Sequence, residues 1–259
     1  MTYANNLHPQ QGEKMVFDAN PVLNERVTHY CPGCHHGIAH RLVSEVLHEL
    51  GVADKTILVA AVGCSTFTYD YFNVDSVEAP HGRACAVATG VRRARPEAVV
   101  FTYQGDGDMA AIGMAESLHA ANRGEKITTV FINNTVYGMT GGQMAPTTLI
   151  GQKTTTTRHG RNFSNEGGPI RLTEIMAGLQ GVAYAARCAL DSVKHVRKAK
   201  KAVRLAFDVQ LDGLGFGFVE LLAGCPTNWH MDPIAANKHI ATDMIPIFPL
   251  GVFKDVKET

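Results

Sequence analysis

The stretch AVVFTYQGDGDMAAIGMAESLHAANRGEKITTVFINN, residues 98–134, decides the fold of this 259-residue chain. It contains two short continuous apolar runs, residues 98–103 and 127–132, of the kind that form buried parallel strands. Residues 109–122 between them predict a helix, which Gly124 would stop. A strand, a helix and a second strand in this order predict two parallel strands joined by a helical crossover.

The same alternation continues on both sides of this stretch and extends the predicted sheet. Helices are predicted over residues 38–50, 82–91 and 191–210, and strands over residues 56–62, 182–189 and 216–222. Alternating strands and helices predict an α/β fold with a doubly wound, mainly parallel sheet. We expect a single domain over residues 1–259, with an extended N-terminal arm (1–29) and a C-terminal tail. Residues 139–169, rich in Gly, Thr and Pro, predict a long functional loop.

Composition narrows the classes of partner and compartment. The formal net charge is 0 and the pI is near 7.2, so no nucleic-acid or anionic-membrane partner is expected. No apolar run approaches the roughly 18 residues that a membrane span needs. The first 16 residues have no apolar signal core, and a cytoplasmic location is therefore expected. In that compartment, six cysteines indicate metal ligation or redox chemistry rather than disulfides.

Two polar motifs at predicted strand ends indicate a metal-diphosphate site. Asp106 follows one predicted strand, and Asn134 follows the next. Ligands of such sheets bind beyond the carboxyl ends of the strands, so these side chains should meet there. A carboxylate and an amide oxygen suit Mg²⁺. Gly105 and Gly107 would let backbone N–H groups reach a phosphate at a helix N-terminus. A Gly-Asp-Gly turn alone is common, but its pairing with Asn134 at this spacing is specific.

The sequence CPGC is a second local signal, with three interpretations that it does not separate by itself. Cys31 and Cys34 could form a thioredoxin-like redox pair. They could bind zinc together with the nearby His35, His36 or His40. They could also supply two of the four thiolates that a [4Fe–4S] cluster needs.

Cysteines elsewhere in the chain favour the cluster. Cys64 and Cys225 each follow a predicted strand, beside the expected metal-diphosphate site. Four cysteines beyond strand ends match a cluster better than a dithiol, which needs only two. Cys85 and Cys188 fall outside this pattern and are expected to be small buried hydrophobic residues.

A family resemblance spans residues 28–229. Together, the following segments resemble the thiamine-diphosphate-binding beta subunits of 2-oxoacid:ferredoxin oxidoreductases, especially the 2-oxoisovalerate/2-oxoglutarate type. One departure is His35, where the family usually has glycine, but it removes no ligand. The segments, in this order, are YCPGCHHG (30–37), VGCS (62–65), HGRA (81–84), YQGDGD (103–108), NNTVYGMTGGQ (133–143) and GCPTNW (224–229).

The resemblance implies a thiamine-diphosphate-binding fold and a role for each matching residue. Mg²⁺ would be held by the side chains of Asp106 and Asn134 and by the carbonyl of Val136. His81 and Arg83 are expected to act in catalysis or substrate contact. The [4Fe–4S] cluster would be held by Cys31, Cys34, Cys64 and Cys225. The further residues expected at the cofactor are Ser65, Gly105, Gly107, Asp108, Tyr137, Gly138, Met139 and Thr140.

The resemblance also implies the reaction and the partners. Enzymes of this family convert a 2-oxoacid and coenzyme A to acyl-CoA and CO₂, and the electrons pass through the [4Fe–4S] cluster to ferredoxin. An alpha subunit would supply a pyrimidine-binding domain with its activating Glu, so the isolated chain is expected to be inactive. Gamma and ferredoxin-like delta subunits are further expected partners.

Substrate choice and the alternatives depend on fewer residues. Relatives acting on 2-oxoglutarate tend to have Lys where this chain has Gly141, and a distal carboxylate would lack that partner here. We therefore expect 2-oxoisovalerate rather than 2-oxoglutarate or pyruvate. The alternative classes are a non-oxidative thiamine-dependent decarboxylase or synthase, and a non-catalytic zinc or redox module. The basic face of residues 194–204 is expected to be solvated, with docking of an acidic partner as the alternative.

Overall fold

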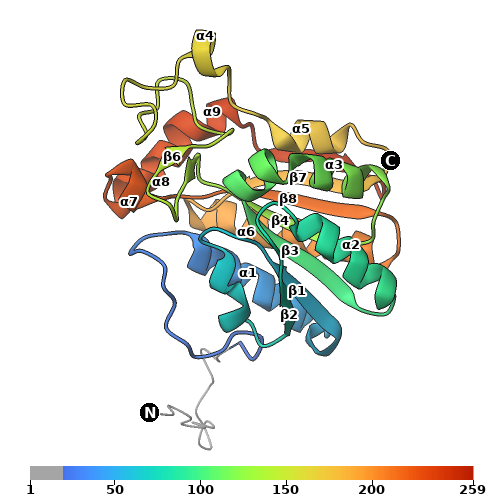
Figure 1. Cartoon of the computed structure of the whole chain (residues 1–259). Coiled ribbons are helices and arrows are strands. Elements are labelled where there is room, and N and C mark those ends of the chain that lie inside the picture. The colour runs from blue at the N-terminus through green and yellow to red at the C-terminus, as the bar shows by residue number, and fades with distance from the viewer. Residues whose placement is uncertain (1–19, 259) are drawn as a thin grey trace, which may run out of the picture.

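A computed structural model describes residues 20–258 of the chain (Figure 1). Most of the predicted N-terminal arm therefore lies outside the described residues. Its described part runs along the edge of the fold, where Leu23 forms a bridge with Phe72. Among the described residues, no helix has both the length and the apolarity needed to cross a membrane.

A seven-stranded sheet forms the centre of the described structure, with strand order β2-β1-β3-β4-β8-β7-β9 (Figure 1). Neighbouring strands are parallel except β9, which is antiparallel to β7. The doubly wound, mainly parallel α/β fold is therefore confirmed. The strands are β1 (Thr56–Ala60), β2 (Asp75–Glu78), β3 (Val99–Gly105), β4 (Thr128–Asn133), β7 (Val182–Ala189), β8 (Phe216–Leu222) and β9 (Gly251–Asp255).

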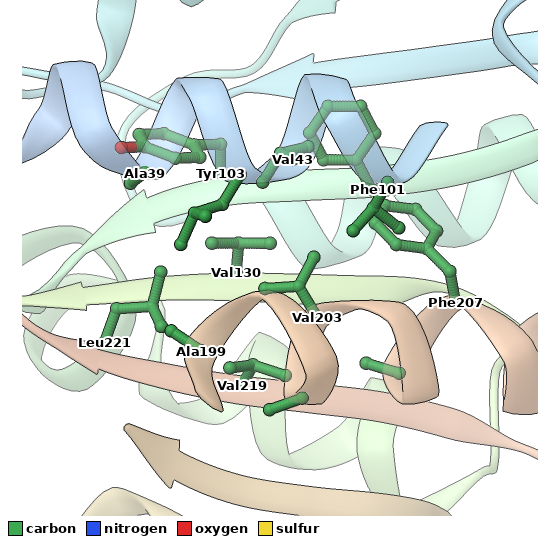
Figure 2. Close-up of a cluster of buried hydrophobic side chains, with 14 of the residues drawn as sticks. Ala39, Val43, Phe101, Tyr103, Val130, Ala199, Val203, Phe207, Val219 and Leu221 are labelled. Carbon is green, nitrogen blue, oxygen red and sulfur yellow. The ribbon is translucent and has the colours of Figure 1, made fainter. Parts of the chain in front are cut away.

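Helices cover both faces of the sheet. The longest two, α1 (His36–Glu49) and α6 (Val193–Leu211), bury apolar residues against β3, β4 and β8. Figure 2 shows Val43 of α1 and Val203 of α6 converging with strand residues in this core. The opposite face packs against α2 (Ala84–Ala94), α3 (Met114–Asn122) and α5 (Leu172–Ala177). Gly51 adopts φ +63 just after α1, as expected of a helix stop.

One predicted helix is interrupted. Residues 109–122 were expected to form a single helix, but a π-helical turn (Asp108–Ile112) precedes α3, which begins at Met114. The break falls at Gly113, where a Cβ would lie 2.6 Å from the carbonyl oxygen of Gly82. Tertiary contact between two backbones therefore overrides the local helical pattern.

Several elements give no periodic signal in the sequence. The exposed strand β2 contains no apolar run, and the C-terminal segment ends in the antiparallel edge strand β9. Ile240, Met244 and Phe248 bury this segment against the rest of the fold. The remaining short elements are β5 (Val136–Tyr137), β6 (Gln143–Met144), α4 (Phe163–Glu166), α7 (Pro226–Trp229), α8 (Pro233–His239), α9 (Ile245–Ile247), a π-turn (Ile240–Met244) and the 3₁₀ turns Ala53–Lys55 and Thr66–Asp70.

The long loop predicted over residues 139–169 is organised by one buried cation. Arg161 is 5% exposed and its guanidinium donates only to backbone carbonyls of the loop. Burial lowers the pKa of Arg161, because no water solvates its charge fully. The accepting carbonyls belong to Ala145, Pro146, Thr148, Glu166, Gly167 and Gly168.

Candidate active site

Four neighbouring parallel strands end at one edge of the sheet. The strands β1, β3, β4 and β8 are followed by Cys64, Asp106, Asn134 and Cys225, respectively. Because the strands are parallel and adjacent, their carboxyl ends meet at the same edge. The convergence that the sequence predicts is therefore present in the fold.

A cavity of about 100 Å³ opens at this edge. It is lined by all eleven residues that the sequence assigns to cofactor contact, together with His81 and Cys64. The eleven are Ser65, Gly105, Asp106, Gly107, Asp108, Asn134, Val136, Tyr137, Gly138, Met139 and Thr140. The remaining lining residues are His36, Val62 and Gly63.

Asp106 is the charged centre of the cavity. It is 3% exposed, and burial raises the pKa of its carboxyl to about 7. Hydrogen bonds offset part of this effect: the Gly107 N–H donates to Oδ1 at 2.9 Å, and the Thr147 hydroxyl donates to Oδ2 at 2.7 Å. No Lys or Arg in the described part of the chain forms an ion pair with Asp106. A buried carboxylate that lacks a cation and faces a cavity fits a divalent metal.

The turn after β4 places a second oxygen ligand beside the first. Asn134 is buried, and its Oδ1 accepts the N–H of Val136 at 3.4 Å. Between these two residues, Thr135 adopts φ +61, in the left-handed region that side chains rarely occupy. Hydrogen bonds from Thr148 and Gln152 hold Thr135 in this conformation. The amide oxygen of Asn134 and the carbonyl of Val136 fit the predicted Mg²⁺ ligands.

Two glycines permit close approach of backbone in the cavity wall. A Cβ on Gly107 would lie 2.2 Å from the ring of Tyr137. A Cβ on Gly138 would lie 3.1 Å from the Sγ of Cys64. The glycine at position 107 therefore fits because Tyr137 packs directly over it, and Gly138 brings the β5–β6 turn against Cys64.

Asp108 orients His81. Its Oδ1 lies 2.7 Å from Nδ1 of His81 and accepts the N–H of Gly82, while its Oδ2 accepts from Gln104 at 2.7 Å. The Nδ1 atom of His81 is therefore engaged with Asp108, and Nε2 is the ring nitrogen left for a ligand. Asp108 lines the cavity as predicted, but its carboxylate is already engaged with protein donors.

Arg83 is not brought into the cavity. Its guanidinium lies 3.1 Å from Glu116 and donates to the carbonyls of Gly82 and Ile112. The sequence-based expectation of a catalytic role for Arg83 receives no geometric support from this arrangement. The structure instead pairs it with α3.

The four cysteines assigned to the cluster gather around this edge. Burial, together with the neighbouring Cys225 and Cys31, raises the pKa of Cys34 to about 11 and that of Cys64 to about 12. Burial also raises the pKa of Cys225, whose Sγ accepts from Asn228 at 3.3 Å. The thiols interact electrostatically, so the three loops that carry them are close together. Thiols with raised pKa values stay protonated at neutral pH unless a metal ionises them.

The described residues contain no group of three or more His, Cys, Asp or Glu arranged to hold a single metal ion. A four-iron cluster is larger than one ion, so its thiolate ligands need not converge on one point. The donor set of four thiols therefore fits the cluster chemically.

The zinc interpretation of the CPGC segment gains no support, because the described residues contain no group of three or more His, Cys, Asp or Glu placed to hold one metal ion. The three candidate histidines, His35, His36 and His40, each direct one ring nitrogen to a protein partner. Burial lowers the pKa of all three, to about 3 for His36. Their partners are the Gly224 N–H at 3.0 Å, the Tyr103 hydroxyl at 2.8 Å and the Tyr30 hydroxyl at 3.1 Å, respectively.

Three contributors to the site escaped sequence reasoning. Thr147 reaches Asp106 from the long loop, and no pattern marks this threonine among the others there. Asn228 links the two halves of the site, because its Nδ2 donates to the Gly138 carbonyl at 2.9 Å as well as to Cys225. Gln104 holds Asp108, and its place in the YQGDGD segment was the only available signal.

Sequence comparisons agree with this geometry. Residues 61–213 match the family described as thiamine pyrophosphate enzyme, C-terminal TPP binding domain. The ketoisovalerate oxidoreductase subunit VorA of Methanothermobacter thermautotrophicus is 47% identical over 240 residues, covering 93% of this chain and 50% of the relative. The 2-oxoglutarate synthase subunit KorB of Archaeoglobus fulgidus is 36% identical over 237 residues, covering 88% and 84%. The chain thus spans about half the length of VorA but most of KorB.

A solved structure has the same fold. The 2-oxoglutarate:ferredoxin oxidoreductase from Magnetococcus marinus, with 2-oxoglutarate, coenzyme A and succinyl-CoA bound, superimposes with a TM-score of 0.72. Sequence identity is 26%, and the match covers 90% of this chain and 83% of that chain.

Proposed function

Because this chain belongs to the thiamine-diphosphate-binding subunits of 2-oxoacid:ferredoxin oxidoreductases, we propose that it carries thiamine diphosphate, Mg²⁺ and a [4Fe–4S] cluster in such an enzyme. The complete enzyme would convert a 2-oxoacid and coenzyme A to acyl-CoA and CO₂ and pass the electrons to ferredoxin. The observation that carries the proposal is the buried carboxylate of Asp106, which lacks a cation and lines a cavity shared with Asn134, Val136 and Cys64.

In this proposal the Mg²⁺ ligands come from the segments that follow β3 and β4. Asp106, the amide oxygen of Asn134 and the carbonyl of Val136 would hold Mg²⁺, with diphosphate oxygens as further ligands. The backbone around Gly105 and Gly107 would contact the diphosphate. Thiamine diphosphate, when bound, supplies a carbon nucleophile that protein side chains lack.

His81 is the side chain best placed to hold or move a proton in the cavity. Its Nδ1 is engaged with Asp108, so Nε2 is the ring nitrogen left to exchange a proton with a ligand. Its ring is one-third exposed and lines the cavity beside Asp106. We propose that His81 contacts substrate or cofactor. Arg83, which pairs with Glu116 outside the cavity, has no direct contact in this proposal.

The cluster would take electrons close to where they are released. Cys31, Cys34, Cys64 and Cys225 are its proposed ligands. The Sγ of Cys64 lies against Gly138, a residue of the cavity wall, so cluster and cofactor would be neighbours. A short separation suits transfer of single electrons toward ferredoxin.

The proposed substrate is 2-oxoisovalerate. This chain has Gly141 in place of that lysine. Gly141 adopts φ +109, a backbone conformation in which a lysine would be strained. The relative named a ketoisovalerate oxidoreductase subunit is more similar to the chain than the one named a 2-oxoglutarate synthase subunit. Turnover of 2-oxoisovalerate and 2-oxoglutarate by the purified complex tests this choice, and a strong preference for 2-oxoglutarate would overturn it.

The proposal includes partners that complete the site. An alpha subunit would supply the pyrimidine-binding domain and its activating Glu, and gamma and delta subunits would extend the electron path to ferredoxin. This chain would act in the cytoplasm as a single-domain subunit.

Metal and cofactor analysis of anaerobically purified complex tests the proposal against its alternatives. We expect thiamine diphosphate, Mg²⁺, and about four iron and four sulfide per chain. Thiamine diphosphate without iron would indicate a non-oxidative decarboxylase or synthase instead. Zinc without thiamine diphosphate would indicate a non-catalytic metal module.

A further inference from the structure

A charged pair lies in the interior of the sheet, away from the cavity lining. Arg187 of β7 and Glu220 of β8 are register partners and are both 0% exposed. The Nε of Arg187 donates to Oε2 of Glu220 at 2.8 Å. Burying two charges is unfavourable unless their geometry is satisfied, and apolar residues can replace such pairs without loss of stability. The pair therefore needs a reason beyond stability.

Every guanidinium nitrogen of Arg187 donates a hydrogen bond. Its terminal nitrogens lie 3.1 and 2.5 Å from the carboxylate oxygens of Glu174, and one also donates to the Pro249 carbonyl at 3.1 Å. These contacts fix the guanidinium in place. The Oε2 atom of Glu220 that accepts from Arg187 also accepts from the hydroxyl of Thr173, so this end of the carboxylate is held in place.

The other oxygen of Glu220 reaches the end of β4. Oε1 accepts from the side-chain amide of Asn133 at 2.7 Å. The NH₂ group of Asn133 therefore faces Glu220, and the amide oxygen faces the other way. That oxygen accepts the backbone N–H of Thr135 at 3.2 Å.

Thr135 is the strained residue of the proposed Mg²⁺-binding turn. It adopts φ +61 and stands between Asn134 and Val136. A left-handed conformation at a residue other than glycine persists only when its surroundings enforce it. The bond from Asn133 to the Thr135 N–H is one of the contacts that do so.

We infer that Glu220, held in place by Arg187, is a positioning residue for the Mg²⁺-diphosphate turn, acting through the side-chain amide of Asn133. This inference rests on the proposed function, because it assigns the turn to Mg²⁺. The ion pair sets the direction of one amide, and the amide fixes the backbone between the two proposed metal ligands. Glu220 touches neither metal nor substrate.

The test measures the Mg²⁺ concentration that half-saturates thiamine-diphosphate binding in the assembled complex, alongside the melting temperature. Glu220→Gln conserves shape but lets either end of its amide face Asn133. We expect it to raise the half-saturating Mg²⁺ concentration about tenfold or more, since a hydrogen bond to a charged group is lost. Glu174→Gln is the matched control: it removes a charge from the same network without touching Asn133, and should change that concentration less than about twofold.

A second variant and a double-mutant cycle keep the inference testable if Glu220→Gln fails to fold. Asn133→Ala leaves the ion pair in place but removes the connecting amide. It should weaken Mg²⁺ binding to about the same extent as Glu220→Gln. Thr135→Gly abolishes the left-handed strain, so adding Glu220→Gln to it should have a smaller effect than in the wild type. If these variants melt at lower temperature but keep the wild-type Mg²⁺ dependence, the inference is overturned and the proposed function still stands. A wild-type complex with no Mg²⁺-dependent cofactor binding would overturn the proposed function and the inference with it.

Discussion

One hydroxyl group illustrates how the site is tuned at the scale of single residues. Thr147 donates to Oδ2 of Asp106, and this bond lowers the carboxyl pKa, although burial outweighs it and raises the pKa to about 7. Without such donors the carboxylate would bind a proton more readily and a metal less readily. The ligand character of Asp106 therefore depends on a residue of the long loop.

Thr147→Val should weaken Mg²⁺ binding, because it removes this donor without changing the shape of the side chain. The loss of a hydrogen bond to a charged group, about 1.5–3 kcal/mol, corresponds to roughly a tenfold or larger rise in the half-saturating Mg²⁺ concentration. Titration of cofactor binding with Mg²⁺ measures it. Thr242→Val, at an exposed and remote threonine, is the control, and equal Mg²⁺ dependence in both variants would contradict the prediction.

Cys225→Ser should reduce cluster content and electron transfer while thiamine diphosphate still binds. Serine is a poorer iron ligand than a thiolate, so iron should fall below about four per chain. Cys188→Ser is the matched control, because burial raises the pKa of that thiol to about 11 and it lies outside the site. Iron and sulfide assays with ferredoxin reduction measure both variants. Unchanged iron in Cys225→Ser would exclude Cys225 as a ligand.

At the scale of elements, close packing rather than backbone freedom explains the turn that follows β3. Gly107 has φ −65, a conformation open to any residue, so its glycine is not needed for the dihedral angle. The ring of Tyr137 from β5 occupies the space of a side chain there. The turn after β3 can therefore pack against the β5–β6 segment only if residue 107 has no side chain.

Gly107→Ala should destabilise the protein by about 1–3 kcal/mol through overpacking against Tyr137. Gly90→Ala is the matched control: it lies within α2 with open space around its Cβ, and should stabilise by about 0.4–1 kcal/mol. Denaturant unfolding of the two variants compares them. Adding Tyr137→Ala to Gly107→Ala should relieve part of the loss, and strict additivity of the two changes would argue against the clash.

Helix α1 carries a pH dependence. His40 lies buried among aromatic rings, and one of its ring nitrogens, Nδ1, has no hydrogen-bond partner. Burial holds the pKa of His40 well below its unfolded value of 6.5. The stability from its neutral form is therefore fully present above pH 6.5 and is lost as pH falls below that value.

The free energy of unfolding should accordingly fall with pH below 6.5 by up to about 1.4 kcal/mol per pH unit from this residue. His40→Gln should flatten the slope by about one proton, whereas His48→Gln, on the exposed face of the same helix, should leave it unchanged. Urea unfolding between about pH 7.5 and 5.5, the range where histidine titrates, measures the slopes. Parallel slopes in wild type and His40→Gln would contradict the assignment.

At the scale of the whole molecule, the site lies at one open edge of a doubly wound sheet. The long loop and α4 extend from this side in Figure 1, and the side chain of Phe163 in α4 is 69% exposed. The cavity is lined by residues for diphosphate and metal, but no described residue in it matches the activating Glu expected from the family. A second subunit is therefore expected to complete the site.

The chain alone should show no 2-oxoacid turnover, while the assembled complex reduces ferredoxin or an artificial acceptor. The physical reason is that orientation and activation of the cofactor ring require groups from the partner. Anaerobic assays of the chain alone, of the partner subunits alone and of the recombined complex measure this. Turnover by the chain alone at the rate of the complex would contradict it.

The sequence by itself determined five of the seven strands of the sheet and the edge at which the site residues gather. Continuous apolar runs mark β1, β3, β4, β7 and β8 because strands buried on both faces must be apolar throughout. Parallel strands then bring everything that follows them to one edge. The family resemblance names eleven residues that the fold then brings together in the lining of one cavity, and their contact with the cofactor stays a prediction.

Only the tertiary structure decided the contacts between segments far apart in the chain. The helix break at Gly113 and the exposed strand β2 give no pattern in the sequence. A neighbouring backbone segment causes the break, and β2 forms by pairing at the edge of the sheet. The pairing of Arg83 with Glu116 and the bond from Thr147 to Asp106 likewise depend on packing. Local sequence encodes periodicity and turn chemistry, whereas the direction of a side chain depends on what the fold places opposite it.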